Sequence, residues 1–195
     1  MIPLDKCKKG YLYKIGMVNS YYSEMCKRDI FEVLNTFTFP ILSDSKELIN
    51  RYLKYEVLEY QDAFSTYFGQ SIQAVLKQND AELTRTIEGM NNHSKEGWEK
   101  NYRGAVTAFQ GILKKEKELV RAGIEELLSC HGNQNTHPLT KEYINYEATA
   151  LVKIANINGL DISIESQLIP NALLPVQELE SYPRYDFFDE LPDSL

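Results

Sequence analysis

The clearest periodicity of apolar and polar positions lies between Pro138 and Pro175. In its first half, the apolar residues recur at intervals of three and four, which is the spacing of one face of an α-helix. These residues are Tyr143, Tyr146, Ala150, Leu151, Ile154 and Ile157. We expect this central helix to begin near Thr136 and to end at Gly159, because glycine readily adopts the left-handed conformation of a helix C-terminus.

After the central helix, residues 161–166 alternate isoleucine with polar residues. A period of two predicts a short extended segment, in which successive side chains point to opposite sides. Pro170 and Pro175 then bracket a short apolar patch.

Two further helices are predicted in the N-terminal third of the chain. Apolar residues at helical spacing fill residues 9–39, and Pro40 should end this helix because the residue before a proline avoids helical backbone angles. A second helix is expected over residues 46–60, with one of the polar residues 43–45 as its N-cap.

An internal repeat with a period near 37 residues begins after residue 62. The segment IQAVLK at 72–77 parallels FQGILK at 109–114, and ELTR at 82–85 parallels ELVR at 118–121. Each copy reads as a helix, a polar turn and a second helix, with Asn79 as the expected cap in the first copy. This period is typical of tetratricopeptide-like arrays, although neither copy carries their full motif. One helical hairpin cannot bury both of its faces, so the two units should stack.

These patterns together predict an all-α protein. We expect about seven to nine helices, mostly in antiparallel hairpins, with one short extended segment. Residues 1–176 are predicted to form a single helical domain. Residues 177–195 are predicted to form an acidic and aromatic C-terminal tail that packs on this domain or on a partner.

Composition narrows the class of partner. A formal net charge of −7 disfavours direct binding to nucleic acid and favours a basic protein partner. The 13 tyrosines suit a protein interface, although many of them can equally line the seams between helices.

No run approaches the ~18 apolar residues of a membrane span, and no signal peptide is evident. With an odd count of cysteines, these features favour the cytoplasm.

No catalytic motif is recognisable, whether a nucleophile elbow, a glycine-rich phosphate loop or HExxH. We therefore predict no enzymatic activity, no catalytic residue and no cofactor. Cys130, His131 and His137 lie close together in the sequence and have the side chains that bind zinc. A structural zinc site needs four ligands, and because no fourth is evident nearby, no metal site is predicted.

Structural roles are predicted for Glu147, Gly159 and Pro170. Glu147 is the one acid flanked by apolar residues on the predicted core face of the central helix. A buried carboxylate must be hydrogen-bonded or paired, and the candidate partners are Arg103 and Arg121.

The tail interleaves acids with aromatic residues, a composition found in segments that recognise a basic partner. The predicted partner-binding residues are Tyr182, Tyr185, Asp186, Phe188, Asp189 and Glu190. In the alternative interpretation, the aromatic residues of the tail pack on the helical body and its acids face solvent. The polar loop at residues 131–137 is the second candidate for a partner surface.

The central segment resembles the C-terminus of the immunity protein 49 family, whose members neutralise polymorphic toxins of bacteria. The likeness follows E-A-x-A-L-x-K-I-A, then x-x-G-L-D-I-x-I-x-S, and then L-I-P-x-x-L-L. It is carried by Glu147, Ala148, Ala150, Leu151, Ile154, Ala155, Gly159, Leu160, Asp161, Ile162, Ile164, Ser166, Pro170, Leu173 and Leu174. A clan of helical immunity proteins paired with certain DNase toxins is a near alternative.

This resemblance implies an immunity protein that binds a cognate toxin in the cytoplasm. A basic toxin of the nuclease type would suit the acidic character of the chain. The alternative is a helical-repeat scaffold or regulator that binds a peptide or protein partner in a groove. Neither nucleic acid nor a membrane is predicted as a direct partner. The sequence does not determine the oligomeric state.

Overall fold

The computed structural model describes residues 4–57, 62–134 and 140–186. These residues form nine α-helices and two short 3-10 helices, and they contain no strand, which confirms the predicted all-α class. The α-helices are α1 (Leu4–Cys26), α2 (Thr38–Ser43), α3 (Lys46–Lys54), α4 (Phe64–Leu76), α5 (Asp80–His93), α6 (Arg103–Lys114), α7 (Lys117–Ser129), α8 (His131–Gln134) and α9 (Tyr146–Ile157). The 3-10 helices are η1 (Glu99–Tyr102) and η2 (Asn171–Leu173).

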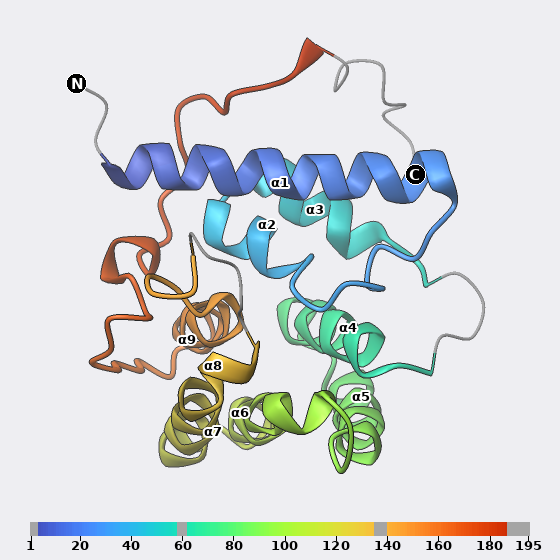
Figure 1. Ribbon diagram of the computed structural model, residues 1–195, viewed down its shortest axis with the longest axis vertical. Coiled ribbons are helices and arrows are strands. Elements are labelled where there is room, and N and C mark those ends of the chain that lie inside the picture. Colours follow the sequence, from blue (N-terminus) through green and yellow to red (C-terminus); the bar gives the residue numbers. More distant parts are fainter. Residues whose placement is uncertain (1–3, 58–61, 135–139, 187–195) are drawn as a thin grey trace.

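The helices form two layers around α9. The long helix α1 spans one side of the molecule with α2 and α3 packed against it, and the hairpins α4/α5 and α6/α7 form the opposite side (Figure 1). Helix α9 contacts α2, α4, α6 and α7. Every residue from Glu147 to Ala155 is therefore buried, as expected for a helix that is covered all round.

The two hairpins follow the repeat seen in the sequence. Helix α5 begins at Asp80 and α7 begins at Lys117, which are 37 residues apart. Gln78 and Lys115, which lie in the preceding turns with the same separation, both have a positive φ. Contacts between α5 and α6 join the two hairpins. The closer likeness to tetratricopeptide units stays a prediction.

The N-terminal helix is shorter than predicted. Helix α1 ends at Cys26, and Lys27 has a positive φ of 50°. Residues 28–37 form successive turns whose hydrogen bonds join residues three apart, so apolar side chains recur there at almost helical spacing. The prediction that Pro40 ends a helix is also wrong. It lies in the first turn of α2, where a backbone N–H has no intrahelical partner to lose.

Two of the predicted helix starts are confirmed by their caps. Ser45 Oγ accepts a hydrogen bond from the Leu48 N–H at 3.2 Å at the start of α3. Asn79 Oδ1 accepts one from the Glu82 N–H at 3.1 Å at the start of α5. Helix α3 nevertheless ends at Lys54, earlier than predicted.

The central helix α9 begins later than predicted. Its N-cap is Asn145, whose Oδ1 accepts a hydrogen bond from the Ala148 N–H at 2.9 Å. Thr136, the expected start, lies outside the described residues. Residues 140–144 form turns instead of a first helical segment.

The chain leaves α9 through a left-handed glycine. Gly159 has a φ of 80°, and the next N–H, that of Leu160, donates to the Ala155 carbonyl at 3.0 Å. In the segment 161–166 that follows, Ile162 is buried and its neighbours are exposed. The predicted alternation is therefore present, although the segment has no strand partner among the described residues.

A buried ionic cluster fastens the C-terminal segment to the helical body. The carboxylate of Asp44, the C-cap of α2, lies 2.6 Å from both Lys9 Nζ of α1 and Lys153 Nζ of α9. The three side chains are at most 3% exposed. Lys9 Nζ also donates to the carbonyls of Pro175 and Gln177, at 3.3 and 2.9 Å.

The second lysine completes this attachment. Lys153 Nζ donates to the Leu173 carbonyl at 2.7 Å, and the Gln177 N–H donates to Asp44 Oδ2 at 3.1 Å. Burial lowers the pKa of Lys153 to about 8, although the charge of Asp44 acts in the opposite direction. Two ammonium groups thus share one carboxylate, and backbone carbonyls of the C-terminal segment solvate the excess positive charge.

Candidate functional site

One pocket collects side chains from distant parts of the sequence. Its volume is about 260 Å³, and it lies where α1, α2, η1, α8 and α9 meet. Tyr11 of α1 is 62% exposed, so the pocket reaches the molecular surface beside this helix. The lining residues are Tyr11, Asn35, Phe39, Tyr102, Gln134, Thr140, Tyr146 and Glu147.

Glu147 supplies the carboxylate of this pocket. It lies in the first turn of α9 and is 7% exposed. Burial raises its pKa to about 7, although its own backbone N–H favours the charged form. The expected pairing with Arg103 or Arg121 is wrong, because these residues pair with Glu126 at 3.2 Å and Glu118 at 3.9 Å. Within the described part of the chain, no side chain pairs or hydrogen-bonds with the Glu147 carboxylate.

The other lining groups are aromatic rings and hydrogen-bonding side chains. Burial and the nearby charge of Glu147 both raise the pKa of Tyr102, so its phenol keeps its proton at neutral pH. The Tyr102 hydroxyl donates to the Gln134 carbonyl at 3.4 Å. The rings of Phe39 and Tyr146 meet edge to face with centroids 5.2 Å apart. The aromatic walls are thus held by contacts of their own.

The wall formed by α8 is tied to the start of α9. Asn145 Nδ2 donates to Gln134 Oε1 at 2.7 Å and to His131 Nδ1 at 3.1 Å. His131 Nε2 donates to the Lys141 carbonyl at 2.6 Å. A carbonyl can only accept, so the imidazole carries its proton on Nε2 and accepts at Nδ1. His131 therefore belongs to the frame of the pocket.

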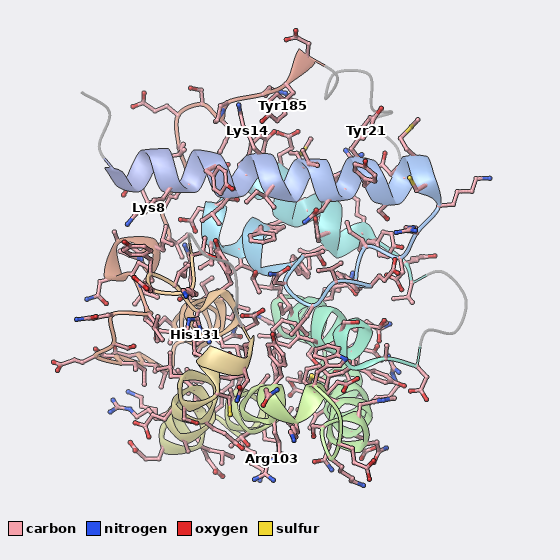
Figure 2. The ribbon with its side chains drawn as sticks, in the orientation of Figure 1. Lys8, Lys14, Tyr21, Arg103, His131 and Tyr185 are labelled. Atoms are coloured by element: carbon pink, nitrogen blue, oxygen red, sulfur yellow. The ribbon has the colours of Figure 1, made fainter. Side chains whose placement is uncertain are left out.

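Cys130 and His131 belong to no cluster of potential metal ligands among the described residues. Both ring nitrogens of His131 are hydrogen-bonded, and Figure 2 shows this residue on α8, between the two layers. No group of three or more potential ligands occurs among the described residues. His137, the other residue of this sequence cluster, lies outside them.

The C-terminal segment crosses α1 on its outer side after it leaves the ionic cluster (Figure 1). The ring of Tyr182 packs on Tyr13 with centroids 4.6 Å apart, and its hydroxyl donates to the Ser43 carbonyl at 2.8 Å. Arg184 Nη1 lies 3.3 Å from the carboxylate of Glu47. This part of the tail is therefore packed on the helical body.

The last described residues of the tail lie on the surface of α1. Figure 2 shows Tyr185 beside Lys14, whose Nζ is 4.1 Å from the ring centroid, a cation–π geometry. Tyr185 and Asp186 are exposed, whereas Tyr182 is half-buried. Three of the predicted partner-binding residues lie outside the described part of the chain, namely Phe188, Asp189 and Glu190.

The other two residues with predicted structural roles lie in the connection after α9. Gly159 borders two further hollows, of about 600 and 450 Å³, at the C-terminal end of α9. Pro170 has a φ of −65° and directly precedes η2, where its carbonyl accepts a hydrogen bond from the Leu173 N–H at 2.9 Å.

Sequence reasoning missed both the pocket and the ionic cluster. The pocket draws its walls from separate elements, and only Glu147 stood out from the sequence. The cluster had one local signal, because Lys153 interrupts the otherwise apolar run from Ala150 to Ala155. A charge at such a position requires a buried partner, but sequence spacing does not indicate which one.

None of the helices in the described ranges has the length and apolar run that crossing a bilayer requires.

Comparisons with known proteins place the chain in a family. No curated protein and no solved structure matches the chain. A family model described as immunity protein 49 matches residues 32–173, which include most of the pocket lining. Because this match covers most of the sequence, the chain belongs to the immunity protein 49 family.

Proposed function

We propose that this immunity protein binds one cognate bacterial toxin in the cytoplasm and blocks its activity. The observation that carries the proposal is the family match over residues 32–173. The net charge of −7 favours a basic toxin, and basic substrate grooves are common in enzymes that act on nucleic acid. We therefore propose a toxin of the nuclease type.

The part of the tail that crosses α1 at Lys14 forms the proposed contact surface. Tyr185 and Asp186 are exposed there, and the Tyr185 ring lies over Lys14 of α1. Tyrosine gives a large contact area with a polar tip, and carboxylates increase the association rate with a basic partner. Tail residues before Tyr185 would position this surface and contribute little contact of their own.

The test is co-expression of the chain with the toxin encoded by a neighbouring gene. We expect the toxin alone to arrest growth of the host and the pair to restore it. The purified proteins should form a complex in which the nuclease activity is lost at equimolar ratio. Arrest that persists when both proteins are present at equal levels would reject the proposal.

A pair of tail substitutions tests the contact surface. The combined change of Tyr185→Ala and Asp186→Asn should raise the Kd for the toxin by about tenfold or more, because interface aromatic residues often dominate affinity. Removal of the whole tail after Val176 is a weaker design, because Gln177 belongs to the ionic cluster. Unchanged affinity would place the contact surface elsewhere.

A groove for a peptide is the second candidate site, and one observation favours it. The hollow of about 600 Å³ lies between the turns of the two hairpins and the end of α9. Several of its walls are apolar, including Leu83, Ile112 and Ile157. A scaffold function predicts that Ile157→Asp abolishes partner binding, whereas the proposed toxin contact predicts no change.

A further inference from the structure

We propose that the pocket around Glu147 is the receptor for one arginine side chain of the toxin. The proposal rests on the proposed function, since it names a contact within the same complex. The pocket is separate from the tail surface but adjacent to it. Tyr11 on its rim and Lys14 under Tyr185 are three residues apart on α1, which places them one helical turn apart.

The carboxylate of Glu147 determines the charge of the occupant. It is more than nine-tenths buried, lines the pocket, and has no ion-pair or hydrogen-bond partner among the described side chains. An isolated buried carboxylate is unfavourable, and a cation that enters the pocket removes this penalty. The described residues that line the pocket include no Lys or Arg, so none of them can supply this cation to Glu147.

The size of the pocket determines the scale of the occupant. About 260 Å³ lies below the range of roughly 300–1,000 Å³ that is usual for small-molecule sites. It is several times the ~30 Å³ that one water molecule occupies in the liquid. A single long side chain fits between these limits, and such a side chain reaches the pocket past the exposed Tyr11.

The walls favour arginine over lysine. Tyr11, Phe39, Tyr102 and Tyr146 supply aromatic rings, on which a planar guanidinium can stack. The guanidinium carries five N–H donors in one plane, and a carboxylate accepts two of them side by side. An ammonium group is more strongly hydrated, so its burial among rings is less favourable.

Affinity measurements on matched variants test the inference. Binding of wild-type chain and variants to inactive toxin is measured by calorimetry. Glu147→Gln and Tyr11→Ala should each raise the Kd by tenfold or more. The control for the first is Glu142→Gln, which removes an exposed charge nearby. The control for the second is Tyr22→Ala, because Tyr22 lies on the same helix and is 63% exposed, against 62% for Tyr11. Both controls should stay within twofold of wild type.

A second measurement needs no toxin. N-acetyl-arginine amide is titrated into the chain while the ¹³C signal of the Glu147 carboxyl group is followed by NMR, with the citrulline analogue as neutral control. We expect a saturable shift with arginine only, and none after Tyr11→Ala. No response to arginine overturns the assignment, and so does wild-type toxin affinity in both pocket variants. If wild-type chain fails to bind the toxin, the proposed function fails, and the arginine titration alone decides the chemistry of the pocket.

Discussion

The ionic cluster yields the sharpest stability prediction, through the substitution Asp44→Asn. Asp44 has a φ of 62°, which is unfavourable for most residues. Asparagine tolerates this left-handed conformation about as well as aspartate, so the backbone should be preserved. The substitution removes the negative charge and leaves the side-chain size almost unchanged. Its effect therefore reports the electrostatics of Lys9 and Lys153.

The expected loss follows from the geometry. The carboxylate lies 2.6 Å from each of two ammonium groups that are at most 3% exposed. Removal of one partner from a buried pair typically costs about 3–5 kcal/mol, because the remaining charge is left uncompensated. Here two charges are left, so we expect the upper part of this range at pH 7. The total stability of a domain is only about 5–15 kcal/mol, so the variant should be close to unfolding.

Urea denaturation followed by circular dichroism measures this loss, and its pH dependence identifies the cause. The pKa of Lys153 is about 8 in the folded state, below the ordinary lysine value of 10.5. Between these values the unfolded chain binds more protons, so stability should rise with pH. In Asp44→Asn the folded pKa of Lys153 should fall further, since its counter-ion is gone. The deficit relative to wild type should therefore shrink as pH rises toward about 8, and it should level off above that pH, where Lys153 of wild type also loses its proton.

A matched control separates this effect from backbone effects. Asp161 also has a positive φ, of 47°, but it is exposed. Asp161→Asn should change the free energy of unfolding by less than about 0.5 kcal/mol, as is usual for surface substitutions. Equal stability of Asp44→Asn and Asp161→Asn would refute the reasoning. A deficit in Asp44→Asn that stays constant with pH would show that uncompensated lysine charge is not its cause.

The remaining predictions concern the two ends of α9. Gly159→Val should destabilise the fold by about 1 kcal/mol or more, because a β-branched residue resists a φ of 80° although open space surrounds the site. Gly132→Val, with equally open space and no positive φ, is the control in the same urea titration, and equal stability of the two variants would contradict a left-handed cap. The second prediction concerns Glu147, whose folded pKa of about 7 exceeds the ordinary glutamate value of 4.5. The folded state then binds more protons between these values, so wild-type stability should fall as pH rises from about 5 to 8, by up to about 3 kcal/mol. Glu147→Gln should remove this slope, so the variant should gain more stability relative to wild type at pH 8 than at pH 5. An equal gain at the two pH values would contradict the prediction.

Local sequence signals predicted the parts of the fold that depend on neighbouring residues. The caps at Ser45 and Asn79 and the left-handed Gly159 are set by hydrogen bonds within one turn, so each was visible in the sequence. The error at residues 28–37 has a physical cause, because consecutive turns repeat every three residues and imitate a helical stripe. The late start of α9 was missed because the Asn145 cap competes with several other polar residues upstream.

The candidate site depended on long-range packing, which spacing along the chain does not encode. The pocket joins Tyr11 to Glu147, and the cluster joins Lys9 to Lys153 through Asp44. The sequence identified Glu147 as unusual but suggested the wrong partners, since Arg103 and Arg121 lie on surfaces where nearer acids pair with them. Residue type thus indicated that the Glu147 charge needed a partner, and only the three-dimensional arrangement showed that no described side chain supplies one.

The attachment of the C-terminal segment has a consequence for synthesis of the protein. Lys9 and Asp44 leave the ribosome well before residues 175–177. Two carbonyls of that later segment accept hydrogen bonds from Lys9, and one of its N–H groups donates to Asp44. A nascent chain can form the hairpins α4/α5 and α6/α7 from local contacts, but Lys9 of α1 loses its water only after residues 175–177 have been synthesised. A product that ends before residue 175 therefore lacks these hydrogen bonds, and its N-terminal helix keeps a hydrated Lys9 that is not attached to the C-terminal segment.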